Sequence, residues 1–404
     1  MTSAIADGHG TNLKTILNPR HRYPVVESVL HHLNVSDVLS LRTVCRAFDW
    51  IPAHLAATFF NLNSHLKGFV LEPNRFRQHM RDCDAIISRG FALNFFVRGC
   101  SQVLYLDVFV ENGQKAERFE KHVTEEEDYV RSAVQLASSD SDENIQSTVL
   151  LRNPRRKTTI RIVRTASFPL ITILRTSFTT ADLNFIVCDR AYSLFPALTI
   201  RQHILYPLRD LDDEGGRRLA EYAHQGWTNR DFNWPDWSSD NLKGLGCRRV
   251  GDKLSLVVHL RDSVAAPSST FSPIIEHSQY KITKITHVPP PVQFGGNVYR
   301  DAARHHVLSM NAETVDSYSL RRALTVGVRS WEIFVKERLR RWTRLELFKM
   351  EPESRPDDFD IAASSDTFAE NHLQPFLQPL SWDYADDILP RWYEEWESTQ
   401  GDAF

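Results

Sequence analysis

The chain has 404 residues, a length that predicts two or three domains. With 42% hydrophobic and 25% charged residues it has the composition of a globular protein with a sizeable core, and its formal net charge of −3 gives no overall attraction to nucleic acid or to an anionic membrane. Its five cysteines are dispersed and form no CxxC pair, which fits a reducing compartment and argues against a disulfide framework and a cysteine zinc site.

No targeting or membrane segment is expected. Residues 1–20 are polar, lack the basic start and apolar run of a signal peptide, and are predicted to form a flexible tail. No stretch approaches the roughly 18 apolar residues that a membrane span needs. We therefore expect a cytoplasmic or nuclear protein without a membrane or nucleic-acid partner.

Residues 23–60 carry a dense helical pattern. Pro24 is expected in the first turn of a helix, where its missing N–H would have no partner. Ser36 is expected to cap a second helix, Asp37 to lie near its positive end, and Pro52 to start a third helical stretch. The apolar residues that fall on the faces of the first two helices are Val26, Leu30, Leu33, Val38, Leu41, Val44 and Phe48.

The pattern then alternates between helices and strands. In chain order it predicts a helix at 75–82, a strand at 85–88, a helix at 91–97, strands at 103–110, 147–152 and 157–164, and a helix over 170–187. Asn74 can serve as the N-cap of the first of these helices, and a turn at Asn153 and Pro154 joins the last two strands.

Polar and proline-rich segments divide the rest of the chain. Residues 137–144 are predicted to form an exposed loop, and the proline and serine clusters at 266–273 and 287–291 mark loops and a break in the fold. Residues 318–349 carry the longest helical pattern. We expect this long helix to pack back on the sheet.

The N-terminal segment contains a specific motif. It consists of Tyr23-Pro24, then Leu33-Asn34-Val35-Ser36-Asp37-Val38, then Leu41-Arg42-Thr43-Val44-Cys45-Arg46-Ala47-Phe48. The motif resembles the F-box, with tyrosine in place of the usual leucine before the proline. The resemblance implies a three-helix module that docks on a Skp-type adaptor of a cullin–RING ubiquitin ligase.

Pro24 and the seven apolar residues named above would form the core and the adaptor-binding face of this module, two roles that periodicity cannot separate. A module of about 40 residues cannot bury all of its own apolar surface, so an apolar face is left for a partner. The alternative is a small helical bundle that packs only on the rest of this chain.

The following region carries a second resemblance. Its matching stretches are 84–96 (DAIISRGFALNFF), 104–110 (LYLDVFV), 178–186 (FTTADLNFI) and 191–199 (AYSLFPALT), with a weaker match at 222–227 (YAHQGW). They resemble a family of fungal proteins with a nucleotidyltransferase-like fold, which often carry an F-box-like segment before it. The resemblance covers about half of the chain.

Nucleotidyl transfer needs residues that this chain mostly lacks. A Gly-Ser turn brings a helix N-terminus close to the phosphates, and carboxylates at i and i+2 on one strand, with a third on a neighbouring strand, hold two metal ions. The matching positions here are Ser88, Arg89, Gly90, Tyr105 and Asp107. They retain one carboxylate, and the strand at 157–164 has none and carries Arg161. We therefore expect a degenerate site without catalytic residues, bound metal or cofactor.

Arg89 leaves two interpretations open. It can pair with Asp107, so that a salt bridge substitutes for the metal, or it can lie in solvent, which is the more common place for an arginine. The neighbouring histidines His31-His32 and His305-His306 are not expected to bind metal, because adjacent residues on a helix do not face one another.

Together these patterns predict an α+β protein. A flexible tail (1–20) precedes an F-box-like helical module (21–65), a mixed-sheet degenerate nucleotidyltransferase-like domain (66–265) and a C-terminal region with Pro-rich loops and a long helix (266–404). We expect a substrate-recognition F-box subunit of a Skp–cullin–F-box ligase, whose catalytically inactive domain binds an unidentified protein substrate. Two alternatives remain: an active or nucleotide-binding transferase with an incidental helical cap, and a ligase-independent interaction protein.

Overall fold

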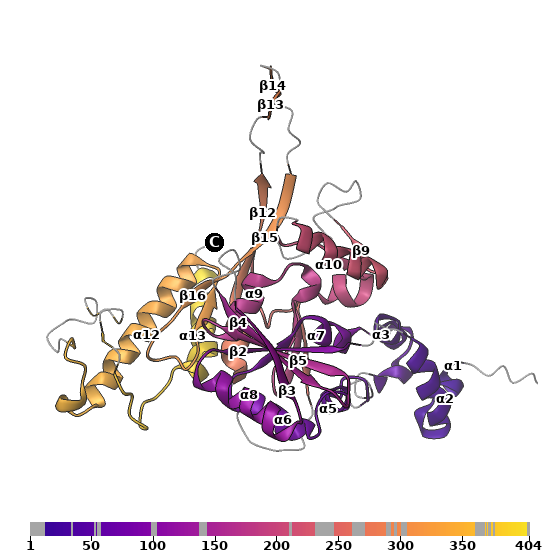
Figure 1. Cartoon of the computed structure of the whole chain (residues 1–404), viewed down its shortest axis with the longest axis horizontal. Coiled ribbons are helices and arrows are strands. Elements are labelled where there is room, and N and C mark those ends of the chain that lie inside the picture. The colour runs from indigo at the N-terminus through magenta and orange to yellow at the C-terminus, as the bar shows by residue number, and fades with distance from the viewer. Residues whose placement is uncertain are drawn as a thin grey trace, which may run out of the picture.

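The computed structural model describes residues 13–33, 35–51, 54, 58–97, 103–136, 144–209, 212–230, 246–260, 271–287, 292–294, 297–299, 305–359, 368, 370, 373–374 and 376–401. Helices and strands are mixed along the chain around one large mixed sheet, which confirms the α+β class (Figure 1). The predicted loop at 137–144 and the proline cluster at 287–291 lie almost entirely outside the described residues.

An eight-stranded sheet forms the centre of the molecule. In spatial order its strands are β11 (Leu256–His259), β7 (Arg190–Ser193), β6 (Asn184–Ile186), β1 (Ile86–Ser88), β2 (Tyr105–Glu111), β5 (Thr158–Thr165), β4 (Ile145–Asn153) and β3 (Val130–Leu136). Neighbours are antiparallel except β2 and β5, which run parallel. A parallel pair needs a crossover connection, and the helix α8 (Gln114–Glu126) lies within it.

The three central strands β1, β2 and β5 are covered on both faces, so their residues alternate between two hydrophobic clusters. On one face Ile87, Val108 and Ile162 pack with α6 (Pro73–Asp82) and α8. On the other face Ile86, Phe109 and Val163 pack with α9 (Pro169–Thr176) and the C-terminal region. The predicted strands at 85–88, 103–110, 147–152 and 157–164 and the helix at 91–97, which is α7 (Arg89–Phe96), are confirmed within one or two residues.

The N-terminal module lies beside the sheet, at the opposite side from the long C-terminal helix (Figure 1). Its elements are α1 (Leu13–Ile16), α2 (Pro19–His32), α3 (Val35–Val44) and the 3-10 turn η1 (Arg46–Phe48). The module joins the cluster on the α8 side of the sheet through buried side chains that include Leu17 and Ile51. It therefore packs on the rest of the chain, and α3 contacts the π-helical turn η3 (Ala197–Gln202).

Two N-terminal predictions were wrong in detail. The predicted tail at 1–20 is folded from Leu13 on, because Leu17 is buried and the side chain of Asn18 caps α2 at Pro19. The helix is kinked at Arg22, so two helical segments meet there and Pro24 lies in the first turn of the second, as predicted. Ser36 does not cap the second helix, since α3 already begins at Val35.

Three later predictions were also wrong. Asn74 does not cap α6, which begins at Pro73, and its side chain accepts a hydrogen bond from Asn63 instead (2.7 Å). The expected helix over 170–187 ends at Thr176, and the chain continues through the 3-10 turn η2 (Thr180–Asp182) into β6. The longest helix, α12, covers Arg329–Lys349 and not 318–349, because 324–326 form the strand β17 (Leu324–Val326).

The C-terminal region completes the second cluster. Trp331, Val335 and Leu339 of α12 belong to this cluster together with side chains of the central sheet, and α12 contacts the strand β17, while direct packing of the helix on the sheet stays a prediction. The helices α11 (Phe271–His277) and α13 (Leu389–Gly401) contact each other in the same region. The strands β12 (Gln279–His287) and β15 (His305–Asn311) project from the body as an arm (Figure 1). Among the described helices, none is long and apolar enough to cross a membrane.

A buried ion-pair network ties the start of the sheet to the C-terminal region. Asp84, which precedes β1, has a left-handed backbone (φ 54°) and a buried carboxylate. It lies 3.0 Å from Nζ of Lys115 and 2.6 Å from Nη2 of Arg322, and Arg322 also approaches Asp386 (3.8 Å). The charge of Asp84 thus compensates cations from two distant segments.

Replacing Asp84 by asparagine should destabilise the protein. Asparagine tolerates the left-handed backbone, so the change removes the charge alone and leaves Arg322 inside the protein without its closest partner. Breaking a buried pair in this way costs about 3 kcal/mol, which urea denaturation should detect as a lower free energy of unfolding. The exposed Asp82→Asn control should change it by less than about 0.5 kcal/mol. Equal stability of the two variants would contradict the role of the network.

Candidate functional site

The register of the central strands places three polar residues in one row. Ser88 of β1 lies opposite Asp107 of β2, and Asp107 lies opposite Arg161 of β5. Opposite residues in neighbouring strands point to the same face, so the three side chains meet. The hydroxyl of Ser88 donates to the backbone oxygen of Asn184 (3.1 Å), which turns it away from any ligand role. The functional pair of the row is Asp107 and Arg161.

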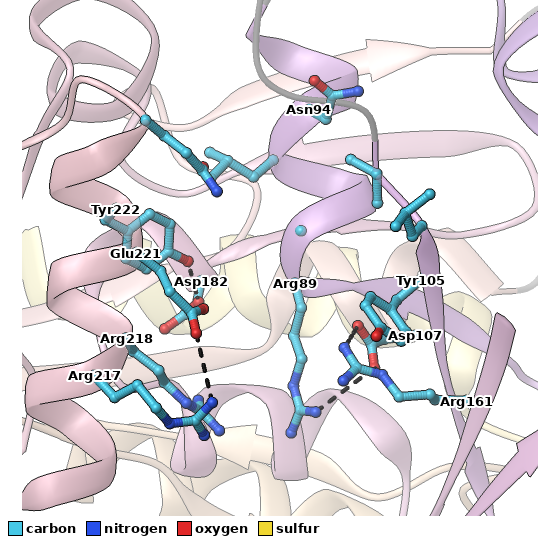
Figure 2. Close-up of a pocket in the computed structure, with 15 residues that line it drawn as sticks. Arg89, Asn94, Tyr105, Asp107, Arg161, Asp182, Arg217, Arg218, Glu221 and Tyr222 are labelled. Carbon is cyan, nitrogen blue, oxygen red and sulfur yellow. Dashed lines mark hydrogen bonds and ion pairs between the residues drawn. The ribbon is translucent and has the colours of Figure 1, made fainter. Parts of the chain in front are cut away.

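Asp107 is an almost fully buried carboxylate that two arginines neutralise. It is 1% exposed, and Nη2 and Nε of Arg161 each lie 2.6 Å from one of its oxygens. Nη1 of Arg89 lies 3.7 Å from the same carboxylate (Figure 2). The predicted ion pair between Arg89 and Asp107 is therefore present, but Arg161 is the closer partner: its Nη2 donates a hydrogen bond to Oδ2, while the contact of its Nε with Oδ1 lacks hydrogen-bond geometry.

Arg89 occupies the position where the resembled pattern has glycine, and its backbone is left-handed (φ 62°). Glycine favours this region, whereas another residue there is strained by about 1 kcal/mol. The turn between β1 and α7 thus has the backbone conformation that glycine favours, although arginine occupies the position. A Cβ atom added to Gly90 would have no described neighbouring atom within 4 Å. Close packing therefore does not require glycine at this position.

A cavity of about 390 Å³ opens in front of this row. It lies between α7, β2 and the helix α10 (Asp213–His224) (Figure 2). Its charged lining residues are Arg89, Arg161, Arg217, Arg218, Asp107, Asp182 and Glu221. The structure thus brings Arg89, Gly90, Tyr105 and Asp107 of the predicted site together in the cavity wall, while Ser88 lies behind it.

The sequence analysis did not identify Asp182, Arg217, Arg218 and Tyr222 as site residues. Asp182 and Tyr222 belong to stretches of the nucleotidyltransferase-like resemblance, which was the available signal. The oxygen Oδ2 of Asp182 accepts hydrogen bonds from the backbone N–H groups of Phe178 and Thr179 (3.1 and 2.9 Å), and Oδ1 accepts one from the hydroxyl of Tyr222 (2.7 Å). Burial, and then the charge of Asp182, raise the pKa of Tyr222 far above its ordinary value, so the phenol stays a donor.

Positive charge is incompletely compensated in the cavity. Burial lowers the pKa of Arg89 from its ordinary value, Asp107 opposes this shift, and the neighbouring charges of Arg218 and Arg161 add to the lowering. Arg89 and Arg161 therefore share one carboxylate and repel each other there, while Arg217 pairs with Glu221 (3.5 Å). An anionic group near Arg89 and Arg161 would relieve this repulsion.

The residues present do not fit a pair of divalent metal ions. Both oxygens of Asp107 are engaged by Arg161, and Tyr105, two residues earlier on β2, stacks its ring against the same guanidinium (4.6 Å). The strand β5 carries no acid, and the hydrogen bonds of Asp182 hold its carboxylate as a structural cap. Hard cations need several free oxygen ligands, which this lining does not offer.

The predicted adaptor-binding residues separate into buried and accessible ones. Val26, Leu30, Val38 and Phe48 are buried in the core shared with the sheet, which is the core role of the two roles predicted for this set. Leu33 and Leu41 are half-buried against the same core. Pro24 and Val44 are exposed.

Comparison with known proteins does not identify a family for this chain. A scan against protein-family models found no match, and a search of curated proteins found none either.

The coupling between Asp107 and Arg161 can be measured with a double-mutant cycle. Arg161→Met and Asp107→Asn should each destabilise the protein, and their combination should destabilise it less than the sum of the two, since each single change leaves the other group unpaired. The expected coupling free energy is about 2 kcal/mol, measured by urea denaturation. Arg152→Met, at an exposed position on the neighbouring strand β4, is the matched control and should change stability by less than about 0.5 kcal/mol. Additive effects would contradict the pairing.

Proposed function

We propose that this protein is a non-enzymatic recognition subunit of a Skp–cullin–F-box ubiquitin ligase. In this proposal the N-terminal F-box-like module docks on a Skp-type adaptor. The cavity at Asp107, on a nucleotidyltransferase-like domain that has lost its metal ligands, binds an anionic group of a protein substrate. The proposal accounts for both the N-terminal motif and the degenerate site.

The observation that carries the proposal is the division of the module's apolar side chains into two sets. One set anchors the module to the sheet domain, as Val26 and Phe48 do. The other set remains in solvent: Val44 is 67% exposed, Tyr23 45% and Val25 44%. Val44 lies inside the stretch 41–48 that most closely matches the F-box pattern. Apolar side chains of this size on one small module favour a protein partner.

The cavity supports a binding role in place of catalysis. Its central carboxylate is neutralised by Arg161 and Arg89, and the guanidinium groups around it attract negative charge. Arginine forks suit carboxylate and phosphate groups in two-point geometry. A substrate segment that presents such a group fits the lining better than a metal-bound nucleotide does.

The adaptor interface can be tested with substitutions at the exposed set. A Val25→Asp, Val44→Asp double variant places charges on the surface without disturbing the buried anchors. It should weaken binding to a purified Skp-type adaptor at least about tenfold in a pull-down and by calorimetry, equivalent to about 1.4 kcal/mol.

Val134→Asp is the matched control, because Val134 is also an exposed valine (48%) but lies on β3, away from the module. It should bind the adaptor as the wild type does. A well-folded wild-type protein that does not bind the adaptor would refute the ligase proposal.

Nucleotide titration distinguishes this proposal from an active transferase. With both oxygens of Asp107 held by Arg161, Mg²⁺ should not increase the affinity for ATP, and no nucleotidyl transfer should occur. Calorimetric titrations with and without Mg²⁺ measure this directly. Nucleotide binding that requires Mg²⁺ and disappears in Asp107→Ala, with an unchanged circular dichroism spectrum, would favour the transferase.

A further inference from the structure

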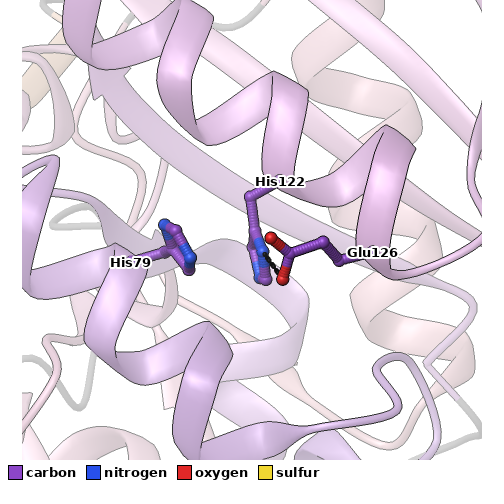
Figure 3. A group of neighbouring side chains, drawn as sticks. All are labelled: His79, His122 and Glu126. Atoms are coloured by element: carbon purple, nitrogen blue, oxygen red, sulfur yellow. Dashed lines mark hydrogen bonds and ion pairs between the residues drawn. The ribbon is translucent and has the colours of Figure 1, made fainter.

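Two helices on the opposite face of the sheet bring together imidazole and carboxylate groups. His79 lies on α6, and His122 and Glu126 lie one turn apart on α8 (Figure 3). The two helices are in contact and cover the sheet face that bears Val108. Asp107 points to the other face, so this cluster is separate from the cavity.

The cluster contains ring nitrogens that the protein leaves unsatisfied. His122 is 3% exposed, and its Nδ1 forms a hydrogen bond with Oε2 of Glu126 (3.0 Å). Within the described part of the chain, Nε2 of His122 and Nδ1 of His79 are buried and have no hydrogen-bond partner. A buried polar atom without a partner is destabilising and needs a reason.

Burial leaves the His122 imidazole neutral. Burial, and then the nearby His79, lower the pKa of His122 to about 4, while Glu126 opposes the shift. Glu126 also pairs with Arg75, whose Nε lies 2.8 Å from Oε2, and Oε1 of Glu127 lies 4.0 Å from Nε2 of His122. A neutral imidazole has the free lone pair that a metal ion requires.

We propose that His79, His122 and Glu126 form a binding site for one divalent transition-metal ion, with Zn²⁺ as the best match to two imidazoles and a carboxylate. One ligand atom from each residue lies within 4.8 Å of the others. Ligand atoms around tetrahedral Zn²⁺ lie roughly 3.4 Å apart, because each bond is about 2.0–2.1 Å long. The ligand atoms have to move closer together, and Glu126 has to leave Arg75, which contacts both of its oxygens through Nε (2.8 Å to Oε2) and Nη2 (3.0 Å to Oε1).

The two imidazole rings are stacked 3.8 Å apart with an interplanar angle of 18°. Parallel rings direct their lone pairs side by side, so the partly exposed His79 turns out of the stack when the ion binds. Arg75, whose side chain is 59% exposed, releases Glu126 into the coordination sphere and moves into solvent. A water molecule supplies the fourth position, as is usual where the protein provides three ligands.

The test uses the full-length protein after treatment with EDTA. Co²⁺ titration should give the visible absorption of a tetrahedral complex with one ion per chain, and Zn²⁺ should displace the Co²⁺. Zn²⁺ should also raise the melting temperature. His79→Gln and Glu126→Gln, both at partly exposed positions, should each weaken Co²⁺ binding about 100-fold or more, since even the loss of a group that only orients a ligand weakens metal binding 10- to 100-fold.

Two matched controls separate this site from the other histidines and acids of the surface. His224→Gln on α10 and Glu125→Gln on α8 change exposed residues and should leave Co²⁺ binding unchanged. The proposal is overturned if the wild-type protein shows no saturable binding of one ion. It is also overturned if both cluster variants bind Co²⁺ as the wild type does, because other groups on the protein surface would then bind the ion.

Discussion

A carboxylate inside a sheet has to be neutralised, and the centre of this molecule is arranged around that requirement. Asp107 is buried, and removing its charge from water costs several kcal/mol unless a cation compensates it. The parallel register of β2 and β5 places Arg161 directly opposite, and the turn after β1 adds Arg89. A shift of this register by one residue would move Arg161 to the other face and leave the carboxylate alone. The ion pair therefore fixes both the strand pairing and the charge of the cavity.

Ion pairs also compensate the charged residues at both ends of the short strand β1. Asp84 before it and Arg89 after it have left-handed backbones, a conformation that aspartate tolerates and that is strained for arginine. Each is held by ion pairs to residues far away in the chain: Asp84 by Arg322 and Arg89 by Asp107. Strain of this kind persists only where the surroundings determine the conformation. Charge pairing thus ties one end of the central strand to the C-terminal region through Arg322 and the other end to β2 through Asp107.

The sequence predicts the local elements of the sheet but not their pairing. The strands β1, β2 and β5 follow from their apolar runs, and the loss of metal ligands follows from Tyr105 and Arg161. The predicted helix over 170–187 was wrong because residues 169–174 of α9 and all of β6 are buried, so one apolar pattern covers two kinds of element. The adjacency of Asp107 and Arg161, and that of His79 and His122, depends on long-range packing that periodicity does not contain.

The balance of charge in the cavity distinguishes it from a metal-dependent catalytic site. Metal-dependent transfer needs acidic groups that attract cations, whereas four arginines and three acids line this cavity. The acid nearest the arginines, Asp107, is already paired, and the hydrogen bonds of Asp182 fix it as a cap. Arg217 pairs with Glu221, so the four arginines exceed the three acids of the lining by one charge in a partly desolvated space, where charges act more strongly than in bulk water. Guanidinium groups in such a space suit carboxylate or phosphate groups better than they suit metal ions.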